Sequence, residues 1–200
     1  MVRLRAVSTD DWPLWRDARL AALTEAPHAF KARLADWHRG GEERWRARLE
    51  LPGAYHVVAL LDGRAVGMAG GMPGDDGRPP ELRSVWVSPE ARGHGVGALL
   101  IGAVETWALR SGATALRLAV LPDNAPAIAL YERHGFVATR EPGPAAGVCV
   151  PVPAPGTIGH DRALRRPSPS APVAAGPALA AASADGSTRE LVMEKALRRS

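Results

Sequence analysis

Three apolar runs in the middle of the chain constrain its fold most strongly. Residues 55–61 and 65–72 are separated by Asp62-Gly63, a pair typical of a two-residue hairpin turn. A third run, residues 82–87, follows a loop rich in Pro, Gly and Asp, and apolar and polar side chains alternate along it. Runs of this length joined by such turns predict an antiparallel three-stranded meander.

Helix and strand patterns surround this meander. Residues 8–11 offer N-cap side chains, and Pro13 suits the first turn of a helix. Apolar residues recur at every third or fourth position from Val96 to Trp107, which predicts an amphipathic helix. The other expected elements are strands at 2–7, 116–120, 136–139 and 188–197, and helices at 12–23, at 42–50 and after Asp123-Asn124. This order predicts an α+β fold with a mixed sheet rather than a doubly wound chain.

Residues 141–187 differ in composition from the rest of the chain. They hold nine of its 18 prolines, many alanines and glycines, and few large apolar side chains. Such a segment can form little core, and Val148-Cys149-Val150 is its best candidate for a short strand. We therefore expect a single domain, residues 1–200, with a flexible Pro-, Ala- and Gly-rich insertion at about 141–187 before the terminal strand.

Composition argues against several classes of function. The net charge is +4 and the pI about 10.0, but the sequence contains no run of five like charges, so a nucleic-acid partner is not expected. The single cysteine, Cys149, excludes an internal disulfide, and the histidines lack metal-ligand spacing, so no metal is expected. The first residues lack the apolar segment of a signal peptide, and the uncharged stretch at residues 167–184 holds four prolines. We expect a cytoplasmic protein without a membrane partner.

A glycine-rich turn between residues 82–87 and the following helix carries the candidate chemistry. It consists of Arg92, Gly93, His94, Gly95, Val96, Gly97 and Ala98. Glycines let the backbone approach a ligand closely, and the free N–H groups at a helix N-terminus bind anions such as pyrophosphate. Arg92 adds a positive charge that can contact or screen phosphates.

Three interpretations of this turn compete on the residues alone. A P-loop is excluded because no Gly-Lys-Ser/Thr follows. Gly93, Gly95 and Ala98 match the dinucleotide fingerprint Gly-x-Gly-x-x-Ala, but five residues separate the strand from Gly93. That strand is also expected to end a meander rather than to open a βαβ unit. A glycine-rich turn without a ligand is the third interpretation.

Two motifs together resemble those of GNAT-superfamily N-acetyltransferases. The turn from Arg92 to Gly97 is similar to the family signature Arg/Gln-x-x-Gly-x-Gly/Ala. Residues 124–136 are similar to a second family motif, Asn-x-x-Ala-x-x-Leu-Tyr-x-x-x-Gly-Phe. The motifs occur in the family's order, and the resemblance covers about residues 2–139 and the final strand. It implies a GNAT-like fold, in which helices flank a central mixed, twisted sheet that splays open.

The resemblance also implies acetyl-CoA as co-substrate. The pyrophosphate is expected on the glycine-rich turn, and the pantetheine arm is expected to pair with the exposed backbone of the preceding strand. The implied cofactor-binding residues are Val85, Trp86, Val87, Arg92, Gly93, His94, Gly95, Val96, Gly97, Ala98, Asn124 and Tyr131.

The implied reaction is direct transfer of the acetyl group to a primary amine. A lysine-like amine, with a pKa near ~10.4, must first lose a proton. Glu81 is the candidate base, with a surface glutamate as the alternative, and a backbone N–H of the strand can stabilise the oxyanion. Tyr131 matches the family position for the acid that protonates the leaving thiolate; a tyrosine packed in the core is the alternative. Asn124 can both cap its helix and touch the pantetheine arm.

The acceptor is expected to be a small-molecule amine or a protein or peptide N-terminus. Residues 24–37, with Phe30 and Trp37, are the expected acceptor-binding element. Trp86 is predicted to point away from its neighbours Val85 and Val87, toward the acceptor cleft. A non-catalytic acyl-CoA-binding module is the alternative function, and homodimers are common in the family.

Overall fold

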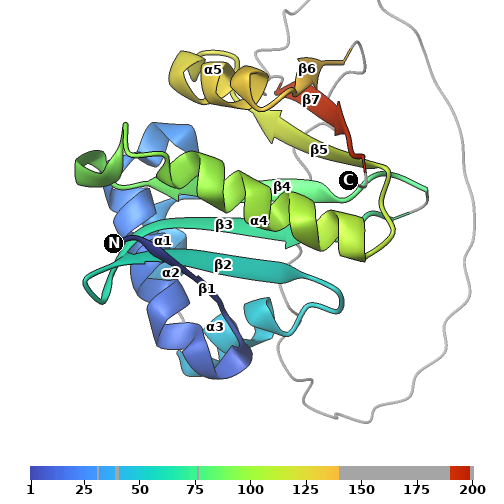
Figure 1. The fold of residues 1–200 in the computed structure, drawn as a ribbon. Helices are drawn as coiled ribbons and strands as arrows, with labels where there is room; N and C mark the ends of the chain where they lie inside the picture. The colour runs from blue at the N-terminus through green and yellow to red at the C-terminus, as the bar shows by residue number, and fades with distance from the viewer. Residues whose placement is uncertain (31, 39–40, 76, 140–189, 199–200) are drawn as a thin grey trace, which may run out of the picture. The chain divides into compact units, whose positions relative to one another are not determined.

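A mixed sheet organises the part of the chain that the structure describes. The structure is a computed structural model, and it describes residues 1–30, 32–38, 41–75, 77–139 and 190–198. Within these ranges, seven strands form one sheet in the order β1-β2-β3-β4-β5-β7-β6 (Figure 1). The strands are β1 (Arg3–Ala6), β2 (Tyr55–Leu61), β3 (Arg64–Met72), β4 (Glu81–Val87), β5 (Ala115–Val120), β6 (Val137–Ala138) and β7 (Leu191–Ala196). All neighbouring strands are antiparallel except β4 and β5, so the predicted mixed sheet is confirmed.

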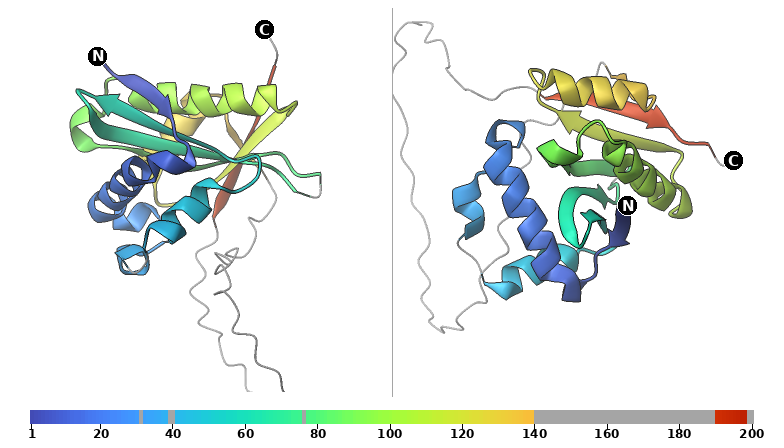
Figure 2. Two further views of the ribbon diagram at one scale, coloured as in Figure 1. Left: turned by 90° about the horizontal axis from the view of Figure 1, so that it is seen from below. Right: turned by 60° about the vertical axis from the view of Figure 1, so that its left-hand side comes forward.

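Helices cover both faces of the sheet. The helix α4 (Val96–Arg110) lies on one face, and α1 (Trp12–Glu25), α2 (Leu34–His38) and α3 (Glu42–Leu49) lie on the other (Figure 2). The fifth helix, α5 (Ala125–Arg133), packs with α4 and β5 on the first face. Three short 3₁₀ helices connect these elements: η1 (Thr9–Asp11), η2 (Pro27–Ala29) and η3 (Pro89–Ala91).

The predicted meander is confirmed. Strands β2, β3 and β4 pair in antiparallel succession. Asp62 and Gly63 both have positive φ, 50° and 81°, as a type I′ hairpin turn requires. The prediction missed α2, because it is only five residues long and has no capping or periodic signal.

Two apolar layers stabilise the sheet, one on each face. On the α4 face, Leu100, Ile101 and Val104 are fully buried, and they pack with Leu116 and Phe136. On the α1 face, the buried layer is Trp15, Ala18, Ala22, Leu23, Trp37, Trp45, Val58, Met68 and Trp86. The sheet is thus a rigid scaffold whose two faces are packed against different helices.

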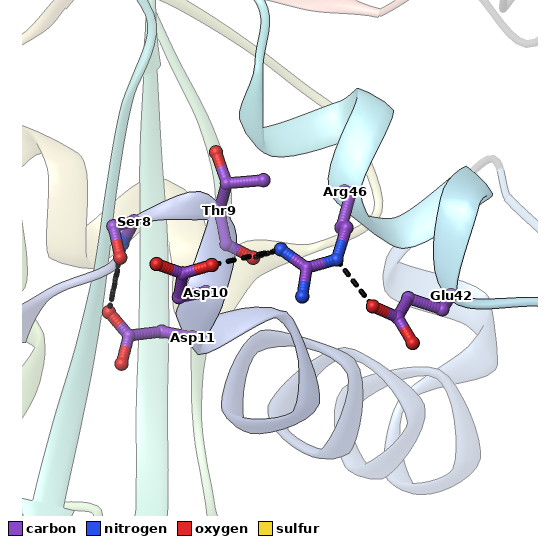
Figure 3. A network of polar contacts seen from close by, with 6 residues as sticks. All are labelled: Ser8, Thr9, Asp10, Asp11, Glu42 and Arg46. Atoms are coloured by element: carbon purple, nitrogen blue, oxygen red, sulfur yellow. Dashed lines mark hydrogen bonds and ion pairs between the residues drawn. The ribbon is translucent and has the colours of Figure 1, made fainter.

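An exposed polar network fixes α3 against the start of α1 (Figure 3). Arg46 Nη1 lies 3.0 Å from Asp10 Oδ1, and Arg46 Nε lies 2.6 Å from Glu42 Oε1. Asp11 accepts hydrogen bonds from the backbone N–H and the hydroxyl of Ser8 at 3.0 and 2.9 Å, which closes a capping box at η1. Because solvent screens such exposed pairs, this network mainly orients the helices and adds little stability.

The expected insertion at 141–187, with the short strand at Val148-Cys149-Val150, lies outside the described residues. In the described ranges, no helix combines the length and the apolar character that crossing a membrane requires.

Candidate active site

The sheet opens between β4 and β5. These parallel strands pair at only two positions, Glu81 with Arg117 and Leu82 with Leu118. Beyond Leu82, the side of β4 that faces β5 has no strand partner among the described residues. The predicted splayed sheet is therefore present, and it leaves a free backbone edge along the second half of β4.

A β-bulge interrupts β4 just where the strands separate. The β3–β4 register shifts between Met68 and Gly70, and Ser84 has a φ of 57°, which is unusual for a residue with a side chain. The bulge shifts the alternation, so that Leu82 and Val85 both pack on the α4 face. The alternation predicted for residues 82–87 therefore fails at the bulge. The prediction that Trp86 points opposite to Val85 and Val87 is confirmed, because Trp86 lies on the α1 face and both valines lie on the α4 face.

The glycine-rich turn follows the free edge of β4 directly. Gly93 and Gly95 both have a φ of 77°, and a Cβ on either would meet open space, so the turn favours glycine for its conformation and not for lack of space. Gly95 is the N-cap of α4, and no described side chain caps this N-terminus. The first N–H groups of α4 thus lack partners within the helix. They lie beside residues 92–95, which are exposed, and such an arrangement suits the binding of an anion.

A close helix contact fixes the start of α4. A Cβ on Gly97 would lie 3.1 Å from Leu130 Cδ2 of α5 and 3.9 Å from Val87 Cγ2 of β4. This approach places the turn between the end of β4 and the helix that carries Tyr131. Because β4, α4 and the parallel β5 form a βαβ unit, the expectation that β4 does not open such a unit is wrong.

Arg92 is held by contacts outside the turn. Its Nε donates to the Val87 carbonyl at 3.1 Å, and its Nη2 donates to Glu25 Oε2 at 2.7 Å. The same carboxylate oxygen accepts from Trp86 Nε1 at 3.0 Å. His94 Nδ1 lies 2.8 Å from the Arg92 carbonyl, a contact within the turn.

Glu25 is the site residue that the sequence did not single out. Partial burial raises the pKa of its carboxyl, but hydrogen bonds from Trp86 and Arg92 outweigh this and hold it below the usual value. The ionised carboxylate therefore links the end of α1 to β4 and to the turn. Glu25 does lie within the predicted acceptor element 24–37, as the last residue of α1 before Ala26-Pro27. Its place at the end of α1, inside the predicted acceptor element, is the sequence signal that could have identified it.

Glu81 lies at the start of β4 in an ion pair with Arg83. Arg83 Nε lies 2.9 Å from Glu81 Oε1, and Arg83 Nη2 lies 2.9 Å from Glu81 Oε2. Each carboxylate oxygen keeps acceptor capacity beyond this contact. Arg117, the register neighbour of Glu81, has a buried Nε without a hydrogen-bond partner.

Tyr131 and Asn124 are placed by α5. Tyr131 is 8% exposed, its ring packs edge-on to Phe136 at 6.0 Å, and burial raises the pKa of its phenol. The side chain of Asn124 accepts a hydrogen bond from the Ala127 N–H at 3.3 Å, so its predicted role as a helix cap is confirmed.

The two predicted acceptor aromatics lie on the α1 side. Trp37 is buried and packs against Trp45 with ring centroids 5.0 Å apart, so it belongs to the interior. Phe30 is half-buried, and the guanidinium of Arg19 lies 4.7 Å from its ring and 5.2 Å from that of Trp37. The structure thus brings together Val85–Val87, the turn and α5, and it separates Glu81 from the turn by the length of β4.

Comparison with known proteins places the chain in a family. The model of the acetyltransferase (GNAT) family matches residues 12–136. The L-2,4-diaminobutyric acid acetyltransferase of Nocardia farcinica is 38% identical over 106 residues, 50% of this chain and 53% of that protein. The thialysine N-epsilon-acetyltransferase of Bos taurus is 44% identical over 59 residues, 30% of this chain and 35% of that protein. The chain thus spans about half, or less, of the length of these relatives.

Solved structures show the same fold. The PaiA N-acetyltransferase of Thermoplasma acidophilum, solved in complex with coenzyme A, superposes with a TM-score of 0.59 at 16% identity. The superposition covers 98% of this chain and 99% of that one. This likeness agrees with the family match, which covers more than half of the residues. The chain belongs to the GNAT acetyltransferase family.

Proposed function

We propose that this chain is an acetyl-CoA-dependent N-acetyltransferase that acts on a primary amine by direct attack, without an acyl-enzyme. The carrying observation is the free edge of β4, which begins after Leu82 and ends at an uncapped helix N-terminus. An extended ligand can pair with such an edge while its anionic end meets the N–H groups of α4.

The residues of the turn fit a pyrophosphate. Gly93 and Gly95 supply the left-handed conformation, and their Cα positions face open space that a ligand can approach. Gly93, His94, Gly95, Val96, Gly97 and Ala98 would bind the phosphates through the backbone. Arg92 contributes positive charge at the rim, although its guanidinium is also bound to Glu25. Asn124 and Tyr131 would border the pantetheine arm from α5.

Acetyl-CoA supplies an activated thioester, and the chain's own residues handle the proton and the charge. Glu81, directly or through water, removes the proton of the acceptor ammonium. A backbone N–H among residues 85–87 stabilises the oxyanion. Tyr131 donates its phenolic proton to the leaving thiolate. A tyrosine phenol of ordinary pKa is already protonated at neutral pH, and burial raises the pKa of this one further.

The proposed acceptor is a small-molecule primary amine. The names of two relatives, a diaminobutyric acid acetyltransferase and a thialysine N-epsilon-acetyltransferase, describe enzymes that act on small amines. The half-buried Phe30 beside α1 is a candidate wall for such an acceptor, and Trp37 supports it from the interior.

Two measurements test this proposal. Isothermal titration with acetyl-CoA should show saturable binding, and absence of heat at high micromolar ligand contradicts the proposal. Release of CoA thiol, followed over a panel of amines that includes 2,4-diaminobutyrate and lysine analogues, should show turnover. Binding without turnover on any amine or peptide would instead indicate a non-catalytic acyl-CoA-binding module.

A further inference from the structure

We infer that Arg19 and Glu25 of α1 are positioning residues that fix the bulged segment of β4 for acetyl transfer. The inference rests on the proposed function, because it concerns the backbone that would stabilise the oxyanion. The two side chains bind Ser84 and Trp86, which flank Val85 on either side.

The bulge needs an external restraint. Ser84 has a φ of 57°, a left-handed conformation that is strained for a residue with a side chain. Such strain persists only where surrounding contacts hold it. Without them, β4 can relax toward regular pairing with β3, and a shift by one residue would turn Val85 to the opposite face.

Arg19 provides the first restraint. It is 6% exposed, and its Nη1 donates to Ser84 Oγ at 3.3 Å. The guanidinium also lies over the rings of Phe30 and Trp37, at 4.7 and 5.2 Å from their centroids. A planar cation that contacts two aromatic rings cannot follow a moving strand freely, so it fixes the position of the serine.

Glu25 provides the second restraint, six residues further along α1. Its Oε2 accepts from Trp86 Nε1 at 3.0 Å and from Arg92 Nη2 at 2.7 Å. Six helical residues span about 9 Å. Two strand residues span about 6.6 Å, so one straight helix can reach both points.

The restraints act on a peptide that is also packed from the other side. Val85 lies against the α4-face layer, while Ser84 and Trp86 are held from the α1 face. The backbone of residues 84–86 is therefore fixed from both faces of the sheet, beside its unpaired edge. This is the preorganisation that an oxyanion-binding N–H requires.

The test compares Arg19→Met with the double variant Arg19→Met/Ser84→Gly. Methionine keeps the length and apolar stem of Arg19 but removes the donor. We expect kcat to fall about 10-fold, a fraction of the loss caused by deleting an oxyanion donor, with KM for acetyl-CoA nearly unchanged. Glycine adopts positive φ without strain, so Ser84→Gly should recover most of the lost kcat in this background. The control is Arg16→Met, because Arg16 contacts Asp17 and Trp12 on α1.

Hydrogen exchange of the backbone amides in β4 provides a readout without turnover. Exchange should accelerate in Arg19→Met and return toward the wild-type rate in the double variant, with Arg16→Met unchanged. Unaltered exchange and kcat in Arg19→Met, or a loss of kcat that glycine does not recover, would overturn the inference. Absence of turnover in the wild type counts against the proposed function, whereas the exchange experiment still decides the role of Arg19.

Discussion

Glu25 Oε2 accepts a 3.0 Å hydrogen bond from the indole N–H of Trp86, whose side chain is 6% exposed. Glu25→Ala leaves this buried donor without its acceptor, so we expect a loss of about 1–3 kcal/mol in the free energy of unfolding. Glu25→Gln keeps an acceptor and should lose less. Urea unfolding measures both, and Trp86→Phe should remove most of the difference between them.

The same carboxylate predicts a pH dependence. The pKa of Glu25 is lower in the folded state than its usual value. Its contribution to stability is therefore present above the usual pKa and disappears as the pH falls through the lowered folded value. Glu25→Gln should show a smaller loss of stability across this acidic range than the wild type. Identical profiles would contradict the role assigned to the charge.

Substitution of Gly95 separates the conformational requirement of the turn from a steric one. A Cβ there would meet no atom, but the φ of 77° strains any residue that has one. For alanine this strain is about 1–2 kcal/mol, so relaxation of the free turn should weaken acetyl-CoA binding about 10-fold. Asparagine tolerates this conformation, and Gly95→Asn should bind within a few-fold of the wild type. Titration calorimetry distinguishes the two, and equal losses would indicate a steric rather than a conformational requirement.

Local signals predicted the parts of the fold that depend on neighbouring residues. The hairpin follows from Asp62-Gly63, and α4 follows from apolar spacing that continues to Trp107. The turn before α4 was also predicted, because glycine at positions 93 and 95 is itself a signal of positive φ. In each case the determinant lies within a few residues along the chain.

The remaining features depend on residues that are far apart in sequence. Ser84 carries no local signal for positive φ; its conformation is supported by Arg19, 65 positions earlier. Glu25 and Arg92 are 67 positions apart. The insertion of β7 between β5 and β6 likewise depends on long-range pairing, which periodicity in a single strand does not encode.

Gly71 is predicted to be intolerant of any side chain. An added Cβ would lie 2.4 Å from Trp107 Cζ3, and Trp107 is itself stacked on Tyr55 at 6.1 Å. Gly71→Ala should therefore cost about 1–3 kcal/mol through overpacking. The matched control is Gly102→Ala in α4, where a Cβ meets open space and should stabilise by about 0.5–1 kcal/mol. Thermal unfolding of the two variants should shift in opposite directions.

His56 predicts a loss of stability in mild acid. It is 5% exposed against Trp15, and burial lowers the pKa of its ring to about 4. The unfolded chain takes up the proton near pH 6.5, so stability is complete above that pH and decreases as the pH falls toward about 4. The slope contributed by this group is at most about 1.4 kcal/mol per pH unit. His56→Phe should remove this component from unfolding curves measured between these pH values, and an unchanged slope would contradict it.

Tyr131→Phe distinguishes two roles of Tyr131, a catalytic acid and a packing residue of the core. The phenyl ring keeps the edge contact with Phe136, so stability and acetyl-CoA affinity should change little. Loss of the hydroxyl should lower kcat on the order of 10²-fold if the phenol protonates the leaving thiolate. Because burial raises the pKa of Tyr131, its titration should not appear in the wild-type pH–rate profile below about pH 10. A variant with wild-type kcat would assign Tyr131 to the core alone, and the leaving thiolate would then take its proton from solvent.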